Sequence, residues 1–197
     1  MRTIEIPVYR FNELKRAAQD EAIAEERHDL IIDLDYVLDD WKEKLKNLGY
    51  GKVDIWYSGF GNQGDGASFT SEENIVEAKG IQEIVKLLNF EDSCLSLDAE
   101  GWTDLELKIK RGDSRYCHEN TISVEAESLT VLPSYLAEIE ERAEGIVRGL
   151  CREIYQDLEV AYDAATSDAA IIELIAAGEY EFYENGHRYI DNEVMED

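Results

Sequence analysis

The sequence predicts an α+β fold in which an antiparallel β-sheet packs against long acidic amphipathic helices. Apolar residues recur at spacings of three and four over residues 29–48 and 133–165, which is typical of helices with one buried face. Segments 53–57, 104–110 and 120–127 alternate apolar and polar residues, which indicates half-buried strands. Because short turns join successive strands, antiparallel pairing is favoured.

The N-terminal half gives the following order of elements. Residues 2–9 alternate as a strand, and Pro7 lacks an amide donor, so this strand is expected at a sheet edge. Asn12 is a favourable N-cap for a helix over 13–27. The second helix, over 29–48, has acidic residues early and lysines late, as the helix dipole prefers, and a glycine ends it.

The C-terminal half adds further helices and strands. A short helix is predicted over 81–88 and a short strand over 95–97. Pro133 suits the first turn of the long helix, and Ser167 suits the cap of a helix over 168–177. The chain then predicts a hairpin, with its strands at 180–183 and 187–190 and the turn at Asn185-Gly186.

The length of 197 residues is sufficient for one domain with a substantial core, so residues 1–197 are predicted to form a single α+β domain. Residues 191–197 are expected to form a frayed acidic tail. The chain contains no internal repeat and no linker of low complexity that would mark a domain boundary.

Charge is the outstanding feature of the composition. The chain has 45 acidic and 19 basic residues, a formal net charge of −26, whereas solubility of a small domain needs a magnitude of only about 2–8. Three explanations arise: a surface that imitates nucleic acid, a basic protein partner, or salt adaptation. The many large apolar residues and the remaining lysines and arginines disfavour salt adaptation.

The same charge excludes other functions. Direct binding to nucleic acid or to an anionic membrane needs a basic patch, so neither is expected. The sequence has no apolar run typical of a signal peptide or membrane span. Its three cysteines and three histidines lack metal-ligand spacing, which favours reduced thiols and a cytoplasmic location. We predict no cofactor, no metal and no catalytic residue, and leave the oligomeric state open.

The acidic helix faces are the first candidate for partner binding. Duplex DNA carries one charge per roughly 1.7 Å of axis, and helices rich in Asp and Glu present a comparable row of charges on a rigid frame. A solvated helix surface is the ordinary alternative. The candidate residues on these faces are Asp29, Asp33, Asp35, Asp39, Asp40, Glu43, Glu138, Glu141 and Glu144.

The glycine-rich segment 57–69 is the second candidate. Its closely spaced glycines permit consecutive tight turns or a bulged hairpin between two strands. A ligand would meet Tyr57, Phe60, Gln63 and Asp65. The alternative is a structural hairpin with side chains that cap the loop and with Trp56, Tyr57, Phe60 and Phe69 in the core. The segment matches neither a P-loop, an EF-hand nor a dinucleotide fingerprint.

The segment YSGFGNQGDGASF resembles the YSGFxxQGDGxxF motif of a family of small, largely uncharacterised proteins encoded by bacteriophages. Residues 4–23 and 166–190 also fit this resemblance, so that together the matching stretches cover somewhat under half of the chain. The resemblance implies a phage origin, an α+β fold and activity in the cytoplasm of a host cell. It supplies no catalytic residues.

Charge and resemblance together lead to one hypothesis. A phage-encoded acidic protein is expected to inhibit a basic, nucleic-acid-binding host defence enzyme by nucleic-acid mimicry, as an anti-CRISPR or anti-restriction protein. The alternative is a binding module, or a metal-dependent enzyme, centred on the glycine-rich hairpin.

Overall fold

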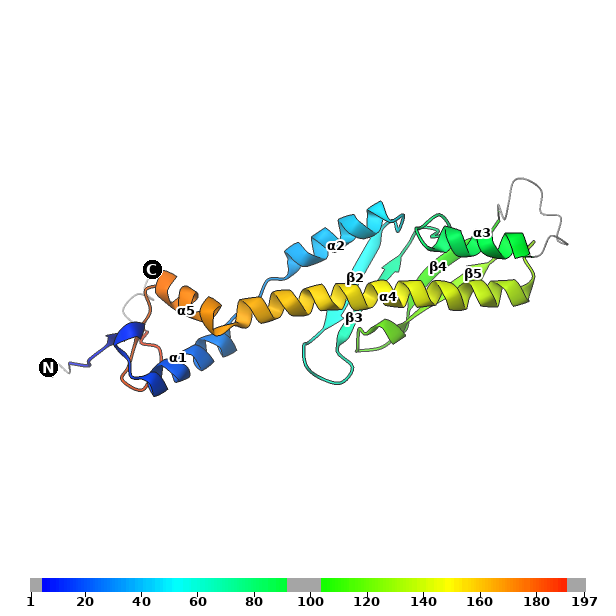
Figure 1. Ribbon diagram of the computed structural model, residues 1–197. Coiled ribbons are helices and arrows are strands. Elements are labelled where there is room, and N and C mark those ends of the chain that lie inside the picture. The colour runs from blue at the N-terminus through cyan, green and yellow to red at the C-terminus, as the bar shows by residue number, and fades with distance from the viewer. Residues whose placement is uncertain (1–4, 92–103, 191–197) are drawn as a thin grey trace, which may run out of the picture. The chain divides into compact units, whose positions relative to one another are not determined.

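The computed structural model describes residues 5–91 and 104–190 (Figure 1). The chain divides into two compact units, unit 1 with residues 1–33 and 160–197 and unit 2 with residues 34–159. A single domain over residues 1–197 stays a prediction. The acidic tail 191–197 and the expected strand 95–97 lie outside the described residues.

Unit 2 contains a four-stranded antiparallel sheet, as the sequence predicted. Its strands, in the order β2-β3-β4-β5, follow the order of the chain, so that β2 and β5 are the edges. The strands are β2 (Val53–Ser58), β3 (Gly66–Ser71), β4 (Glu106–Arg111) and β5 (Ile122–Glu127).

Alternation of apolar and polar residues explains which face of this sheet is buried. In β4, Leu107 and Ile109 are buried while Lys108 is exposed, and Ile109 lies opposite the buried Val124 of β5. In β3, which has neighbours on both sides, Phe69 is 0% exposed. One face of the sheet therefore carries the core of unit 2.

Three helices accompany this sheet: α2 (Asp35–Asn47), α3 (Ile81–Glu91) and α4 (Pro133–Thr166) (Figure 1). The spacing of three and four predicted the buried stripe of α4. Cysteine takes one position in that stripe. The buried residues of α4 are Ile139, Ala143, Val147, Cys151, Ile154 and Leu158.

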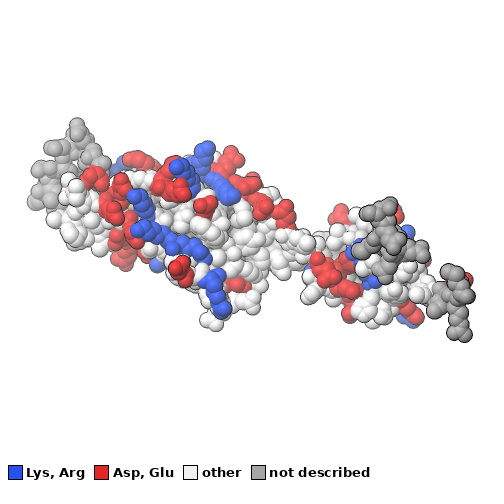
Figure 2. Space-filling model, turned by 180° about the vertical axis from the view of Figure 1, so that it is seen from behind, with Lys and Arg blue, Asp and Glu red and all other residues white. Residues whose placement is uncertain are grey.

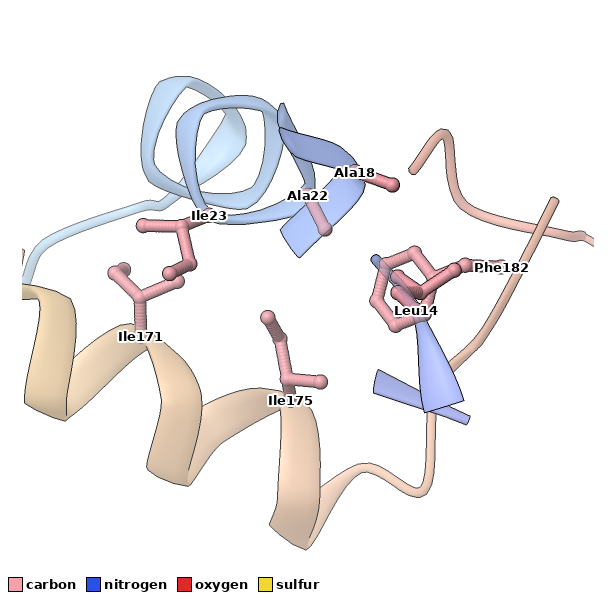
Figure 3. Packing of buried hydrophobic residues seen from close by; sticks show 7 residues of the cluster. All are labelled: Leu14, Ala18, Ala22, Ile23, Ile171, Ile175 and Phe182. Atoms are coloured by element: carbon pink, nitrogen blue, oxygen red, sulfur yellow. The ribbon is translucent and has the colours of Figure 1, made fainter. Parts of the chain in front are cut away.

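Unit 1 is built from α1 (Arg16–Asp29), α5 (Asp168–Ala177) and a small sheet of β1 (Tyr9–Arg10) and β6 (Glu181–Phe182). Two short 3-10 helices, Phe11–Glu13 in unit 1 and Glu119–Thr121 in unit 2, complete the described elements. Figure 3 shows the core of unit 1, which gathers Leu14, Ala18, Ala22, Ile23, Ile171, Ile175 and Phe182.

The start of the chain differs from the prediction. Among the described residues the N-terminal strand comprises only Tyr9–Arg10, and Asn12 caps no helix. A 3-10 turn occupies this position because the Glu13 carboxylate accepts a hydrogen bond from the Arg10 amide at 2.7 Å. Helix α1 begins later, after Lys15, which is extended and makes no side-chain cap.

The predicted helix over 29–48 is also shorter than expected. Asp29 is the last residue of α1, and α2 begins at Asp35. Leu30 packs against the core of unit 1, whereas Leu34 is buried in unit 2. Residues 30–34 thus connect the two units, so the periodicity read across them did not belong to one helix.

The C-terminal turn at Asn185-Gly186 is confirmed. The Tyr183 amide donates to the His187 carbonyl at 2.9 Å, and Gly186 has a φ of +97°, which glycine adopts readily. The flanking strands are shorter than predicted: Phe182 forms a single bridge with Arg188, and β6 pairs with β1.

Candidate interaction surfaces

The glycine-rich loop 59–65 joins β2 to β3 and is closed by its own backbone and by Asp65. The Asp65 carboxylate accepts a hydrogen bond from the Asn62 amide at 2.8 Å, and the Asp65 amide donates to the Asn62 carbonyl at 3.1 Å. Aspartate commonly stabilises turns in this way. The carboxylate predicted to meet a ligand therefore bonds within the loop.

Close packing explains two glycines of this segment. A Cβ atom on Gly66 would lie 2.5 Å from the Cα atom of His118, and one on Gly64 would lie 3.1 Å from the Tyr116 ring. Gly61, in contrast, has open space around it and a φ of +93°. Glycine at 64 and 66 thus lets the segment around Tyr116 and His118 approach the hairpin.

An aromatic group anchors the hairpin to α4. The Phe60 ring stacks on Tyr155, with 5.7 Å between ring centroids, and lies 6.0 Å from the Tyr57 ring. The Tyr155 hydroxyl donates to the Gly59 carbonyl at 3.4 Å. Burial raises the pKa of Tyr155, and Glu159 and Asp65 raise it further. Tyr155 could not be identified from the sequence, because the contact joins segments that are far apart in the chain.

The structure brings Tyr57 and Phe60 together, whereas Asp65 bonds to Asn62 and Gln63 is exposed on the loop. The predicted aromatic core is only partly correct. Phe69 is fully buried, whereas Tyr57 is 36% exposed and the other two aromatic side chains are half-buried. These contacts favour the structural interpretation of the hairpin.

The acidic residues of α2 are exposed, but lysines lie among them. Asp39 forms an ion pair with Lys42 at 3.4 Å. The Lys44 amine lies 3.5 Å from the Trp41 ring centroid and 3.6 Å from the Glu153 carboxylate. The candidate residues that lie on α2 are Asp35, Asp39, Asp40 and Glu43.

Asp29 and Asp33 do not share a helix face with the α2 residues. Asp29 ends α1, where its carboxylate pairs with the ring of His28 at 2.9 Å. Asp33 lies in the connection before Leu34. The expected row of carboxylates on one helix over 29–43 was therefore wrong, because that helix begins at Asp35.

The acidic residues of α4 lie mainly in contacts within unit 2. Glu144 accepts a hydrogen bond from the Val124 amide at 3.3 Å and pairs with Arg148 at 2.6 Å. Glu138 pairs with Arg142 one helical turn away, and Glu141 is exposed. Of the three candidates on α4, Glu144 thus supports the sheet, Glu138 has a cation beside it, and Glu141 faces solvent.

In unit 1, every lysine and arginine of the described residues 5–33 and 160–190 lies in an ion pair with a carboxylate of the same unit. The distances are 3.7 Å for Arg10–Glu181, 3.1 Å for Lys15–Glu184, 3.1 Å for Arg16–Asp20 and 3.4 Å for Arg188–Glu26, and the fifth pair is Arg27–Asp168. Carboxylates in excess of these cations give the unit a negative surface.

A feature of the sequence could have indicated this surface. From Glu153 to His187 the chain has no lysine or arginine, although acidic residues recur throughout. Figure 2 shows acidic side chains in clusters on the visible face of each unit, and a row of basic side chains across unit 2. Exposed acidic residues of unit 1 beyond the predicted candidates include Glu13, Glu21, Asp163, Glu173 and Glu179.

Two further chemical properties concern the described residues. Between residues 5 and 91 and between 104 and 190, no helix is both long and apolar enough to cross a membrane. Within the same ranges, no three side chains of His, Cys, Asp or Glu gather as ligands for a metal ion.

The comparisons with known proteins place the chain in a family. The model of a family described as Domain of unknown function (DUF8835) matches residues 34–168, so the chain belongs to this family. The match covers unit 2 and the first residues of the second segment of unit 1. Among curated proteins and among solved structures, nothing matches the chain.

Proposed function

We propose that this protein binds a basic, nucleic-acid-binding protein and inhibits it by nucleic-acid mimicry. One observation carries the proposal: the described lysines and arginines of unit 1 all lie in ion pairs within that unit, while the unit carries further exposed carboxylates. The unneutralised charge is then available to a partner. A phage origin and a defence enzyme as target, of the CRISPR or restriction type, complete the proposal.

Negative charge held on a rigid frame supports this proposal. A groove that evolved for DNA or RNA attracts any surface whose negative charges are comparably dense and fixed. Helices hold carboxylates with little conformational freedom, so less entropy is lost on binding than with a flexible acidic tail. Complementary charge accelerates association and makes it sensitive to salt.

Exposure divides the acidic residues into two groups. Glu144 is directed into the fold by its bond to β5, and we assign it a structural role. Asp35, Asp40 and Glu43 are exposed on α2, and Glu173 and Glu179 are exposed in unit 1. We assign the partner-binding role to these exposed carboxylates.

The experiment measures DNA cleavage by a panel of restriction endonucleases and CRISPR effector nucleases with increasing amounts of the protein. Inhibition should weaken at high salt and should be relieved by excess DNA that the enzyme binds without cleaving. A variant with Asp35→Asn, Asp39→Asn, Asp40→Asn and Glu43→Gln tests α2, and one with Asp163→Asn, Glu173→Gln and Glu179→Gln tests unit 1.

Each of these two charge variants is a control for the other, because both reduce the net negative charge but at different places on the protein. Gln63→Ala, which leaves the charge intact, tests the alternative that the hairpin binds the partner. Loss of inhibition in a charge variant, with Gln63→Ala unchanged, supports mimicry. Failure to inhibit any enzyme of the panel, or inhibition that persists in both charge variants and at high salt, contradicts the proposal.

A further inference from the structure

Unit 1 carries an apolar surface pocket of about 420 Å³. The N-terminal segment forms one wall and α5, with the turn that follows it, forms the other. The residues that line the pocket include Arg10, Phe11, Ile172, Ala176, Glu179 and Tyr180. The size falls in the range of pockets that accept ligands or large side chains.

The Arg10 guanidinium, a polar group of the lining, is engaged by the pocket wall and by a neighbouring carboxylate. The Arg10 guanidinium donates to the Glu179 carbonyl at 2.5 Å and pairs with Glu181 at 3.7 Å. Ile172 is nevertheless 38% exposed, whereas Ile175, one turn later on α5, is 1% exposed and belongs to the core in Figure 3. The pocket thus exposes apolar surface beside the core of unit 1.

The charge around the pocket selects its occupant. Glu179 lies in its wall, and the Glu13 carboxylate accepts a hydrogen bond from the amide of Arg10, which also lines the pocket. The cations here are Arg10 and Arg188, whose guanidinium lies 3.4 Å from the Tyr180 ring centroid. The cations of the described part of unit 1 are paired within the unit. An apolar pocket in such an environment complements an apolar side chain that is flanked by lysine or arginine.

We infer that this pocket is the anchoring point of a basic amphipathic segment of the partner protein, with a Leu, Phe or Trp side chain inserted between Phe11 and Ile172. The inference rests on the proposed function and deepens it, because it names the site and the kind of segment. The anchor supplies affinity through burial, as central apolar residues do at interfaces, while the flanking charges accelerate encounter.

The test uses the full chain and three synthetic peptides, with binding followed by fluorescence anisotropy at low and high salt. The first peptide is basic with a Leu and a Trp on one helical face, the second is equally basic with Gln at those positions, and the third is acidic with the Leu and Trp kept. Ala176→Phe fills the pocket from its wall. Ala177→Phe, the same change at the next position, which is exposed and outside the lining, is the matched control.

The inference predicts that the first peptide binds at least about tenfold more tightly than the other two, and that Ala176→Phe alone removes this advantage. Circular dichroism and thermal unfolding establish that both variants fold. Equal binding of the two basic peptides, or equal binding to both variants, overturns the anchor and leaves mimicry through charge intact. If the acidic peptide binds as tightly as the first peptide, the proposal of a basic partner is overturned. Absence of binding by all three peptides overturns the inference.

Discussion

The backbone amide of Ala126 on β5 donates a hydrogen bond to Glu140 on α4, with 2.9 Å between the nitrogen and Oε1. The Val124 amide donates likewise to Glu144 at 3.3 Å. Because β5 is an edge of the described sheet, these donors have no partner on that side among the strands of residues 5–91 and 104–190. Carboxylates of a helix thus satisfy an edge that would otherwise be open to pairing with another chain.

Removing these acceptors should therefore destabilise the sheet. We expect Glu140→Ala and Glu144→Ala each to lower the free energy of unfolding by about 1 kcal/mol and to increase self-association through β5. Urea unfolding and light scattering measure the two effects. Glu141→Ala, an exposed neighbour on the same helix, should stay within about 0.5 kcal/mol. An equal loss in Glu141→Ala would contradict the edge-capping role.

Gly66 and Gly61 should respond differently to substitution. Gly66→Ala forces a Cβ atom against the backbone of His118, and we expect a loss of about 1–3 kcal/mol in unfolding free energy. Gly61 has space, so only its φ of +93° opposes a side chain, and Gly61→Asn should lose less stability than Gly66→Ala because asparagine tolerates positive φ better than most residues. Chemical denaturation compares them. If Gly66→Ala were as stable as the wild type, the close approach to His118 would be wrong.

Asp104 links acid stability to the start of α4. Its carboxylate accepts bonds from the Thr130 hydroxyl and the Leu129 amide, both at 2.6 Å, and from the Ser128 hydroxyl at 3.0 Å. These hydrogen bonds, of which the one from the Thr130 hydroxyl has the largest effect, lower the pKa of Asp104 from 3.8 to about 2. Because the pKa of Asp104 is lower in the folded state than in the unfolded state, its carboxylate stabilises the fold at pH values above about 4. This contribution is lost as the pH falls from about 4 to about 2.

Asp104→Asn should accordingly lower the melting temperature at neutral pH and flatten its decline between about pH 4 and about pH 2. Thermal unfolding at a series of pH values measures both effects. Identical pH profiles for variant and wild type would show that the bonds to Asp104 contribute nothing to stability.

Glu26 should give the opposite pH dependence. Burial raises its pKa above 4.5 against the attraction of Arg188, and the nearby Glu25 and Asp29 raise it further. For a raised pKa, the stabilising contribution is present below 4.5 and is lost as the pH rises through the folded value. Between acid and neutral pH, the stability of Glu26→Gln should therefore fall less than the stability of the wild type. A steeper fall in the variant would contradict this assignment.

The local pattern of apolar residues was sufficient to predict the sheet and the long helix. Alternation placed Leu107 and Ile109 inward, and the spacing of three and four identified the stripe from Ile139 to Leu158, because each pattern reports one buried face. The same periodicity failed at residues 30–34, where Leu30 and Leu34 pack in different units. A pattern gives no sign of which core an apolar residue joins.

The roles of residues on the candidate surfaces were harder to predict, because they depend on contacts between segments that are distant in the sequence. Nothing in the sequence near Glu144 indicates the Val124 amide, and nothing near Phe60 indicates Tyr155. The contact between Glu144 and β5 is evident only in the folded chain, and the structural role that we propose for Glu144 rests on it. The net charge was evident from composition, but the pairing of the cations in unit 1 requires the folded chain.

The central claim is that carboxylates of this protein occupy a groove built for nucleic acid. The most direct measurement immobilises the protein, captures proteins from bacterial lysate at low salt, and elutes them with double-stranded DNA, single-stranded RNA or an uncharged polymer. We expect that nucleic acid, but not the polymer, releases a nucleic-acid-binding enzyme, and that the charge variants capture less of it. Captured proteins that stay bound in excess nucleic acid, and that bind the charge variants equally well, would contradict it.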